Sequence, residues 1–538
     1  MCGIVGFTGR ENALPILIKG LYSLEYRGYD SAGVAAFTKD GLRVVKARGR
    51  IANLEEKIKE EGGDMYCTCG IGHTSCATHG EPSDRNSHPH LGGKGKVAVV
   101  HNGIIENYKE LRERLEAHGY EFKSETDTET VAHLVDYLHT GKQEDLAKTV
   151  LQAVQRLRGS YALGVVSMDN TQEIVAARRG NPLVIGIGEG ENMIASDITA
   201  IINRTKRYII LDDNEVAIVR PDSVVVMNEF GDVVEKEIQT VNWDMSAAEK
   251  GGYQHFMLKE IMEQPKAVAD TVKPRIKNDA VVFEDNGLTD ERLREIEHIH
   301  IIGCGSALHA GMVGKRVIEA MCRIRCTAEV ASEFRYENPI IGKKDMCIVI
   351  SQSGETADTL AAMRLAKQAG AFTIAIVNVV SSTIAREADG VLYTWAGPEI
   401  SVATTKAYSA QLSALYLISV KIARVRGLIS IGDERALCAE LQRLPECIEQ
   451  TLGCQSDMQR IATLYANRSS VFFLGRGLDY AAALEASLKL KEISYIHSEA
   501  YAAGELKHGT ISLIEEGTLV VALATQPALF EKTVFSYA

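Results

Sequence analysis

Short runs of hydrophobic residues, broken by turn residues, fill the first part of the chain to about residue 240. Four runs have the length and composition of β-strands: 3–8, 33–37, 97–101 and 161–167. Two longer stretches, 106–118 and 128–139, have the apolar spacing of helices. The pattern predicts a layered domain of strands and helices, which we assign to residues 2–240.

The pattern changes after residue 240. Residues 243–275 are polar and helical with few strand signals, and we interpret 241–287 as a linker. From His298 onward, hydrophobic runs of strand length alternate with helical stretches. This alternation is typical of a parallel sheet covered by helices on both faces.

The second half contains an internal repeat. A strand followed by Gly303-Cys304-Gly305 recurs as a strand followed by Gly475-Arg476-Gly477, 172 residues later, and Glu333 and Glu505 keep the same offset. Matched spacing at two landmarks indicates two copies of one α/β domain, at 288–427 and 460–538. The first copy continues through further strands and a long helix, and a full second copy would run well beyond residue 538. We therefore expect the second domain to be truncated.

Composition narrows the function classes. The chain has 538 residues and a net charge of −12, which argues against non-specific binding to nucleic acid or to an anionic membrane. It has no apolar run of 18 residues and no secretory signal at its start. Its 11 cysteines lack zinc-like spacing, so we expect reduced thiols, no metal and a cytoplasmic protein.

Cys2 is the first candidate for chemistry. Once the initiator Met is removed, this residue carries a thiol beside a free α-amine, whose ordinary pKa is about 7.7–8.0. The amine can then act as the base for its own nucleophile. Taken alone, a cysteine here favours the interpretation of a small buried residue, and only the surrounding motifs change that.

A dense polar motif follows a buried strand in the second half. Hydroxyl and amide side chains at 351–356 precede a predicted helix, and no Gly-Lys-Ser/Thr follows them. Hydroxyls and free N–H groups at a helix start bind anions, so we predict a phosphate site here. The alternative is a helix cap rich in Ser and Thr. The repeat offset puts Leu523, Ala524 and Thr525 at this place in the second copy, which is too apolar for phosphate.

Five motifs of the first domain occur in a recognisable order: 2–6, 25–33, 78–80, 101–103 and 124–128. Together they resemble the N-terminal-nucleophile glutaminase domain of the class II amidotransferases, a layered α/β/β/α fold. The resemblance implies that Cys2 attacks the glutamine amide, with Asn102 and Gly103 forming the oxyanion hole. It also implies a glutamine-binding set: Arg27, Thr78, His79 and Asp127. The local alternatives are a hairpin turn at Asn102-Gly103 and a helix N-cap at Asp127.

One motif departs from the family pattern. The family has Arg-Trp where this chain has Ser75-Cys76. The missing arginine would hold the glutamine carboxylate through a bidentate contact that Ser75 cannot make. The resemblance implies that the family's tryptophan, at the position of Cys76, is the gate residue on the path that ammonia takes from the glutaminase site to the sugar site.

The second half resembles the sugar isomerase domains of the glucosamine-6-phosphate synthase family, through motifs at 303–306, 351–356, 401–406, 488–495 and 504–509. The resemblance implies a sugar-phosphate site with these residues: Cys304, Gly305, Ser306, Ser351, Gln352, Ser353, Thr356 and Val402. It also implies that Glu492 is the base, His508 opens the sugar ring and Lys489 carries a proton. The charge run at 489–492 alone favours a solvated helix face, and only the family context supports the catalytic roles.

The resemblance implies that the chain makes glucosamine 6-phosphate and glutamate from fructose 6-phosphate and glutamine, as a homodimer without a cofactor. Two alternatives stay open. One is a sugar-phosphate isomerase or deglycase with an impaired glutaminase domain, favoured by Ser75 and Cys76. The other is a sugar-phosphate sensor, which the retained Glu492 and His508 oppose.

Overall fold

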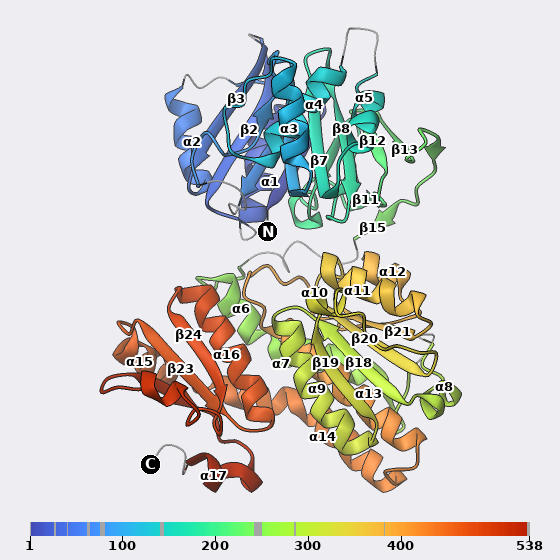
Figure 1. Ribbon diagram of the computed structural model, residues 1–538, viewed down its shortest axis with the longest axis vertical. Coiled ribbons are helices and arrows are strands. Elements are labelled where there is room, and N and C mark those ends of the chain that lie inside the picture. The colour runs from blue at the N-terminus through green and yellow to red at the C-terminus, as the bar shows by residue number, and fades with distance from the viewer. Residues whose placement is uncertain are drawn as a thin grey trace. The chain divides into compact units, whose positions relative to one another are not determined.

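The computed structural model describes residues 2–25, 28–39, 41–61, 65–75, 81–139, 145–241, 250–283, 287–380 and 382–534. The chain divides into two compact units, Met1–Met245 and Ser246–Ala538. Figure 1 shows antiparallel strands with helices in the first unit and alternating strands and helices in the second.

The first unit contains two antiparallel sheets. The eight-stranded sheet has the order β15 (Gln239–Thr240), β11 (Arg207–Ile210), β9 (Val184–Ile187), β10 (Asn192–Ala195), β1 (Gly3–Thr8), β4 (Cys69–Ser75), β2 (Ser31–Thr38), β3 (Gly41–Arg48). The seven-stranded sheet has the order β14 (Val233–Val234), β13 (Ser223–Met227), β12 (Val216–Arg220), β8 (Asn170–Arg179), β7 (Gly159–Ser167), β6 (Val97–Ile105), β5 (His90–Leu91).

Helices cover the outer faces of the two sheets, which makes four layers. α1 (Ala13–Leu24) and α2 (Ile51–Glu60) share a core with the first sheet. Three helices share a core with the second sheet: α3 (Tyr108–Ala117), α4 (Asp127–Leu138) and α5 (Leu146–Val154). A third core lies between the sheets. The predicted α/β/β/α arrangement is confirmed.

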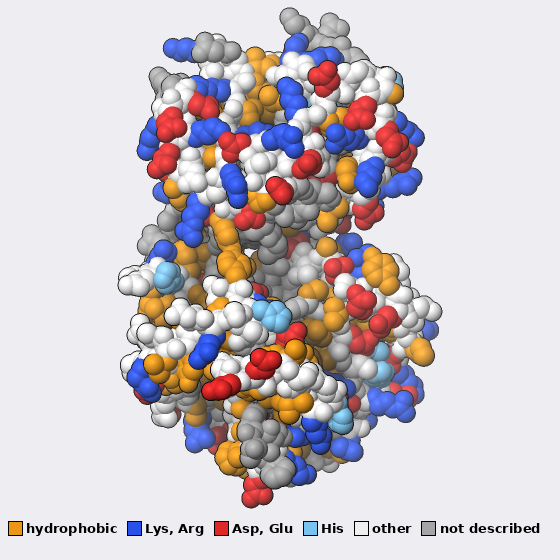
Figure 2. Space-filling view, turned by 60° about the vertical axis from the view of Figure 1, so that its left-hand side comes forward, with side chains coloured by type: hydrophobic (Ala, Val, Ile, Leu, Met, Phe, Trp, Pro, Cys, Tyr) orange, Lys and Arg blue, Asp and Glu red, His pale blue; other side chains and the backbone are white. Residues whose placement is uncertain are grey.

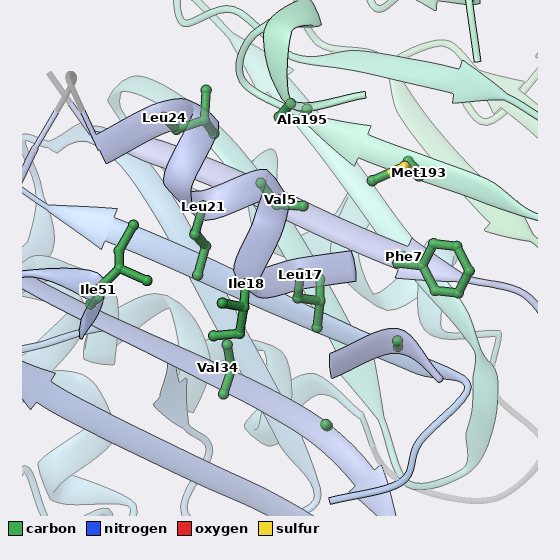
Figure 3. Packing of buried hydrophobic residues seen from close by; sticks show 14 of the residues in the cluster. Val5, Phe7, Leu17, Ile18, Leu21, Leu24, Val34, Ile51, Met193 and Ala195 are labelled. Carbon is green, nitrogen blue, oxygen red and sulfur yellow. The ribbon is translucent and has the colours of Figure 1, made fainter. Parts of the chain in front are cut away.

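The fully buried strand β1 shows how the layers form. Ile4 belongs to the core between the sheets, whereas Val5 and Phe7 belong to the core under α1. Side chains alternate between the two faces of a strand, so a strand with apolar residues throughout can serve two cores. Figure 3 shows Val5 and Phe7 beside the apolar face of α1, which carries Leu17, Leu21 and Leu24 at helical spacing.

In the second unit, part of the predicted linker packs into the core. α6 (Phe256–Met262) and α7 (Gln264–Val272) precede a short hairpin, β16 (Ile276–Lys277) and β17 (Ala280–Val281). Val268 and Val272 of α7 share a core with α13 (Lys406–Val425) and α14 (Ile431–Leu452). These residues therefore belong to the second unit rather than to a free connection.

The first repeat is a five-stranded parallel sheet with helices. Its order is β19 (Arg325–Val330), β18 (His298–Gly303), β20 (Asp345–Ser351), β21 (Phe372–Val377), β22 (Gly390–Tyr393). The helices of this part are α8 (Asp290–Glu295), α9 (Ser306–Cys322), α10 (Ala331–Phe334), α11 (Ala357–Gln368), α12 (Thr383–Glu387) and α13. The parallel α/β sheet predicted from the alternating pattern is confirmed.

The second repeat reproduces the first with the predicted offset. It consists of α15 (Gln455–Tyr465), α16 (Leu478–Ser494), α17 (Phe530–Val534) and a parallel sheet in the order β24 (His497–Ala502), β23 (Ser470–Gly475), β25 (Leu519–Ala522). α9 begins at Ser306 and α16 at Leu478, 172 residues later. Gly305 and Gly477, which precede these helices, have φ of 55° and 58°.

The described surface mixes charged and apolar side chains. Figure 2 shows acidic and basic side chains interspersed on both units, with hydrophobic ones more visible on the second. In the part of the chain that the structure describes, no helix combines the length and the apolar character needed to cross a membrane. The same ranges contain no group of three or more His, Cys, Asp or Glu side chains arranged to hold a metal ion.

Candidate active sites

Three strands of the first unit bring Cys2 and Asn102 together. Cys2 immediately precedes β1, and Asn102 lies on β6 of the facing sheet. The Asn102 amide Nδ2 donates a hydrogen bond to the Cys2 carbonyl oxygen at 3.0 Å. Ser75 ends β4, and its hydroxyl oxygen lies 3.6 Å from the Cys2 sulfur. The residue that departs from the family motif therefore contacts the predicted nucleophile.

The structure overturns the hairpin interpretation of Asn102-Gly103. Both residues lie inside β6, paired with Ala162 and Tyr161 of β7. Gly103 has a φ of 134°, and an added Cβ would lie 2.1 Å from the Ser160 carbonyl oxygen. Only glycine fits this backbone conformation and this space. β6 therefore has a glycine with unusual backbone geometry, Gly103, directly after Asn102.

Asp127 is buried at the start of α4. Its Oδ2 accepts the Ile105 N–H at 2.8 Å, and the Thr128 hydroxyl lies 3.4 Å from Oδ1. The helix N-cap is Thr126, whose side chain accepts the Glu129 N–H, so the N-cap interpretation of Asp127 is wrong. A carboxylate in the first turn is favoured by the helix dipole. Asp127 thus contacts the end of β6 at Ile105, which lies two residues beyond Gly103 along the strand.

Three further histidines, which the sequence analysis did not assign to the site, lie here: His73 and His101 are buried, and His88 is half-buried. The ring nitrogens His88 Nε2 and His101 Nδ1 lie 2.7 Å and 2.9 Å from the Thr128 hydroxyl. His73 Nε2 lies 2.9 Å from the Asn102 Oδ1. Burial lowers the pKa of His73 to about 4 and that of His88 well below its ordinary value. The signal that could have found them is the density of histidines, because five of the chain's 14 lie between residues 73 and 101 inclusive.

The other predicted glutamine-site residues, Arg27, Thr78 and His79, lie outside the described residues, as does Cys76.

The buried thiols of Cys67 and Cys69 provide a contrast with Cys2, which is partly exposed. Burial raises their pKa to about 11 and about 12. Since the thiolate is the reactive form, these two cysteines are inert at neutral pH.

In the second unit, the polar motif forms a loop between β20 and α11. The Ser351 and Thr356 hydroxyl oxygens lie 2.9 Å apart, and Ser351 Oγ accepts the Gly354 N–H at 3.0 Å. Ser353 Oγ accepts the Glu355 N–H at 3.2 Å. Thr356 is the N-cap of α11, yet its side chain caps no helix N–H. The hydroxyls thus face one another across the loop instead of capping the helix.

Cys304 and Gly305 lie beside this loop. β18 and β20 are parallel neighbours, so their carboxyl ends share one edge of the sheet. The Cys304 sulfur lies 3.7 Å from the hydroxyl oxygen of Thr359, in the first turn of α11. Burial raises the pKa of the Cys304 thiol. Gln352 is half-buried in the loop, whereas Val402 is 62% exposed in the segment before α13.

The two repeats meet at α9 and α16. The Ser306 hydroxyl donates to the Glu485 carboxylate at 2.7 Å, and Lys489 Nζ donates to Ser306 Oγ at 3.1 Å. Lys489 also forms ion pairs with Glu485, at 3.4 Å, and with Glu492. The structure therefore brings a predicted sugar-phosphate residue, Ser306, into contact with a predicted proton carrier, Lys489.

His508 lies apart from this network. It is exposed in the turn after β24, and among the described residues its ring makes no hydrogen bond to Lys489 or Glu492. Glu485, which the sequence analysis did not single out, also joins the repeats, through Ser306 and His309. Its position on α16, one turn before Lys489, is the sequence signal that could have found it.

The second repeat fills its own counterpart of the polar loop. Thr525, which follows β25, takes the place of Ser353, and its N–H and hydroxyl both donate to the buried Asp479 carboxylate. Asp479 lies in the first turn of α16, where the first repeat has Ala307. An internal carboxylate thus holds the donors that would otherwise face an anion. That only the first copy binds phosphate stays a prediction.

Comparisons with known proteins match both units. The glutamine amidotransferase domain model matches residues 73–203, and the SIS domain model matches 292–421 and 464–534. The chain is 55% identical over 533 residues to glutamine–fructose-6-phosphate aminotransferase [isomerizing] of Caldanaerobacter subterraneus subsp. tengcongensis, covering 99% of this chain and 87% of the relative. The protein of the same name from Clostridium tetani is 54% identical over 535 residues, with the same coverage.

A solved structure also resembles the second unit. The C-terminal domain of glucosamine-fructose-6-phosphate aminotransferase from Francisella tularensis is 38% identical. The likeness covers 54% of this chain and 81% of that one, with a TM-score of 0.52. The family models give a glutamine amidotransferase domain followed by two SIS-matching segments, the relatives match nearly the whole chain, and the solved structure matches about half of it.

Proposed function

The chain belongs to the isomerizing glutamine–fructose-6-phosphate aminotransferases, and we propose on this basis that it makes glucosamine 6-phosphate and glutamate from fructose 6-phosphate and glutamine. The observation that carries the proposal is that one chain holds both half-sites. Cys2 lies against Asn102 in the first unit, and Ser306 contacts Lys489 in the second.

The first half-reaction releases ammonia from glutamine. The Cys2 sulfur adds to the side-chain amide carbon, while the α-amine of Cys2 takes the thiol proton and passes it to the leaving nitrogen. The oxyanion formed is stabilised by Asn102 Nδ2 and the Gly103 N–H, each contributing about 2.7–4 kcal/mol. Loss of ammonia leaves a thioester, which water hydrolyses to glutamate. The contact between Asn102 and Cys2 supports this assignment.

Asp127 is proposed to bind the α-amine of glutamine. Its carboxylate is buried, and each oxygen keeps further acceptor capacity beside its contact with Ile105 N or Thr128. Arg27, Thr78 and His79 complete the proposed pocket on the strength of the resemblance.

The second half-reaction places the amine on the sugar. Ammonia adds to the C2 carbonyl of open-chain fructose 6-phosphate and water leaves, which gives an imine. A proton then moves from C1 to C2, and the C1 hydroxyl proton passes to the imine nitrogen, which gives the 2-amino aldose. Glu492 is the proposed base for this transfer, Lys489 the proton carrier and His508 the group that opens the ring. The ion pair between Lys489 and Glu492 supports the first two roles.

The phosphate is proposed to bind at the loop between β20 and α11. Ser351, Gln352, Ser353 and Thr356 supply hydroxyl and amide donors there, beside the N-terminus of a twelve-residue helix. The neighbouring loop with Cys304, Gly305 and Ser306, together with Val402, is proposed to border the sugar.

Assaying the two half-reactions separately tests this proposal. Purified protein should release glutamate from glutamine, and should form glucosamine 6-phosphate when glutamine and fructose 6-phosphate are both present. Product formed from ammonium but never from glutamine would instead support the isomerase alternative, which Ser75 and Cys76 in place of the family's Arg-Trp favour. Binding of fructose 6-phosphate without any turnover would support the sensor. The cytoplasmic location and the homodimer remain predictions, and light scattering of the pure protein checks the latter.

A further inference from the structure

His73 occupies a central and buried place in the glutaminase site. It lies on β4, where its backbone pairs with Ile4 of β1 and Gly33 of β2. Its side chain is almost inaccessible to solvent. The ring nitrogen Nε2 lies 2.9 Å from Asn102 Oδ1 and 3.0 Å from the carbonyl oxygen of His101.

These two contacts determine which ring nitrogen carries the proton. A backbone carbonyl is only an acceptor, so the nitrogen beside the His101 oxygen must be a donor. Nε2 therefore carries hydrogen, and the Nε2–H group is shared between the His101 carbonyl and Asn102. Since burial lowers the pKa of His73 to about 4, the ring is neutral at physiological pH with its one N–H on this side.

The tautomer in turn determines how the Asn102 amide is turned. A donor at His73 Nε2 requires the amide oxygen on its side, which puts the Asn102 Nδ2 group on the opposite side, toward Cys2. There Nδ2 donates to the Cys2 carbonyl oxygen at 3.0 Å. The reversed amide would set its N–H₂ group against an N–H and its oxygen against a carbonyl, so both contacts would become repulsive.

We propose that His73 is a positioning residue for glutamine hydrolysis: it holds the Asn102 amide with its nitrogen facing the nucleophile. An amide nitrogen has two N–H groups, so one can bind Cys2 and the other can receive the oxyanion. The inference rests on the proposed function, because it assigns a role to a neighbour of the proposed oxyanion hole. In this role His73 does not contact glutamine. The His101 carbonyl fixes the His73 ring, and the ring fixes the Asn102 amide.

Two substitutions separate positioning from packing. His73→Leu fills a similar space but loses the donor, so only the Cys2 carbonyl oxygen still favours the amide nitrogen on its side, and the preference for this orientation weakens. His73→Gln keeps an N–H that can reach Asn102. Loss of one oxyanion donor lowers kcat about 10²–10³-fold, so a partly misoriented donor in His73→Leu should lower glutaminase kcat about 10–100-fold. The KM for glutamine should change less than about threefold, because the ground-state amide needs this donor less than the transition state does.

His133→Gln is the matched control. His133 is also buried in this unit, but its ring contacts the Glu121 carbonyl rather than Asn102. The His133→Gln variant should keep the wild-type kcat for glutamine hydrolysis. His73→Gln should retain most of the activity that His73→Leu loses. Iodoacetamide alkylation of Cys2 displaces iodide and forms no oxyanion, so its rate, followed by peptide mass spectrometry, should be the same in all three variants.

A double-mutant cycle provides the decisive readout. In an Asn102→Ala background, His73→Leu should cause no further loss of kcat, because the group it orients is gone. A loss of the same size in both backgrounds, or wild-type kcat in His73→Leu, would overturn the inference while leaving the proposed function intact. If Asn102→Ala itself hydrolyses glutamine at the wild-type rate, the proposed oxyanion hole fails, and the positioning role fails with it. The melting temperature of each variant shows whether the unit is folded.

Discussion

The loop between β20 and α11 depends on one glycine, and replacing it tests the phosphate site. Gly354 has a φ of 65°, in the left-handed region. An added Cβ would lie 1.9 Å from the hydroxyl oxygen and 2.5 Å from the Cβ of Ser382. Because Ser382 is buried and its Cβ is fixed to the backbone, rotation of the hydroxyl alone does not remove the clash.

The magnitude follows from two costs. A left-handed conformation costs alanine about 1–2 kcal/mol, and overpacking in a filled site costs about 1–3 kcal/mol. The loop can avoid part of this cost by moving, and Ser351 loses its contact with the Gly354 N–H when it does. A loss of 1.4 kcal/mol corresponds to tenfold in affinity, so Gly354→Ala should weaken fructose 6-phosphate binding about tenfold or more.

Isothermal titration calorimetry measures this affinity directly. Gly342→Ala is the control, because that glycine precedes the same strand and its added Cβ would meet nothing closer than 3.9 Å. Glutaminase activity should stay unchanged in both variants, since Cys2 and Asn102 belong to the other unit. Unchanged sugar-phosphate affinity in a folded Gly354→Ala protein would refute the assignment of phosphate to this loop.

Three further predictions follow from individual contacts. Ser351→Ala removes the partner of Thr356 and one phosphate donor, worth about 1 kcal/mol, so calorimetry should show fructose 6-phosphate affinity about fivefold lower. Ser75→Arg should lower the glutamine KM if the α-carboxylate lacks a cationic partner; an unchanged KM would mean that another group already holds it. Burial raises the pKa of Glu260 from 4.5 to about 7, so the folded state binds this proton more tightly than the unfolded state does. The resulting contribution to the free energy of unfolding is full below pH 4.5 and is lost as the pH rises through about 7. Glu260→Gln should therefore raise the melting temperature at pH 8 and change it little at pH 5.

The sequence predicted the buried strands best. The hydrophobic run at 3–8 coincides with β1, and the run at 161–167 lies within β7, because strands that contribute to two cores are apolar throughout. The prediction ended this strand at residue 101, because Asn102-Gly103 has the composition of a turn. In the structure, β6 continues to Ile105. Only the pairing with β7 reveals that the strand continues, and pairing across the sheet is a tertiary property.

The sequence predicted which residues belong to the candidate sites but not how these residues are arranged in space. The motifs located Cys2, Asn102, Ser351 and Lys489, yet no local pattern relates β4 to β6 or α9 to α16. The contact between Ser306 and Glu485 joins residues 179 positions apart in the chain. His73 escaped notice for the same reason, since its meaning depends on an amide that reaches it from the opposite sheet.

Transfer of the amide nitrogen is the measurement that tests the central claim most directly. Wild-type protein is incubated with fructose 6-phosphate and glutamine labelled with ¹⁵N at the side-chain amide, and the sugar phosphates are analysed by mass spectrometry. The account predicts ¹⁵N-labelled glucosamine 6-phosphate with wild-type protein, and none with Cys2→Ala, which should still bind fructose 6-phosphate. Unlabelled product only, or labelled product from Cys2→Ala, would contradict it.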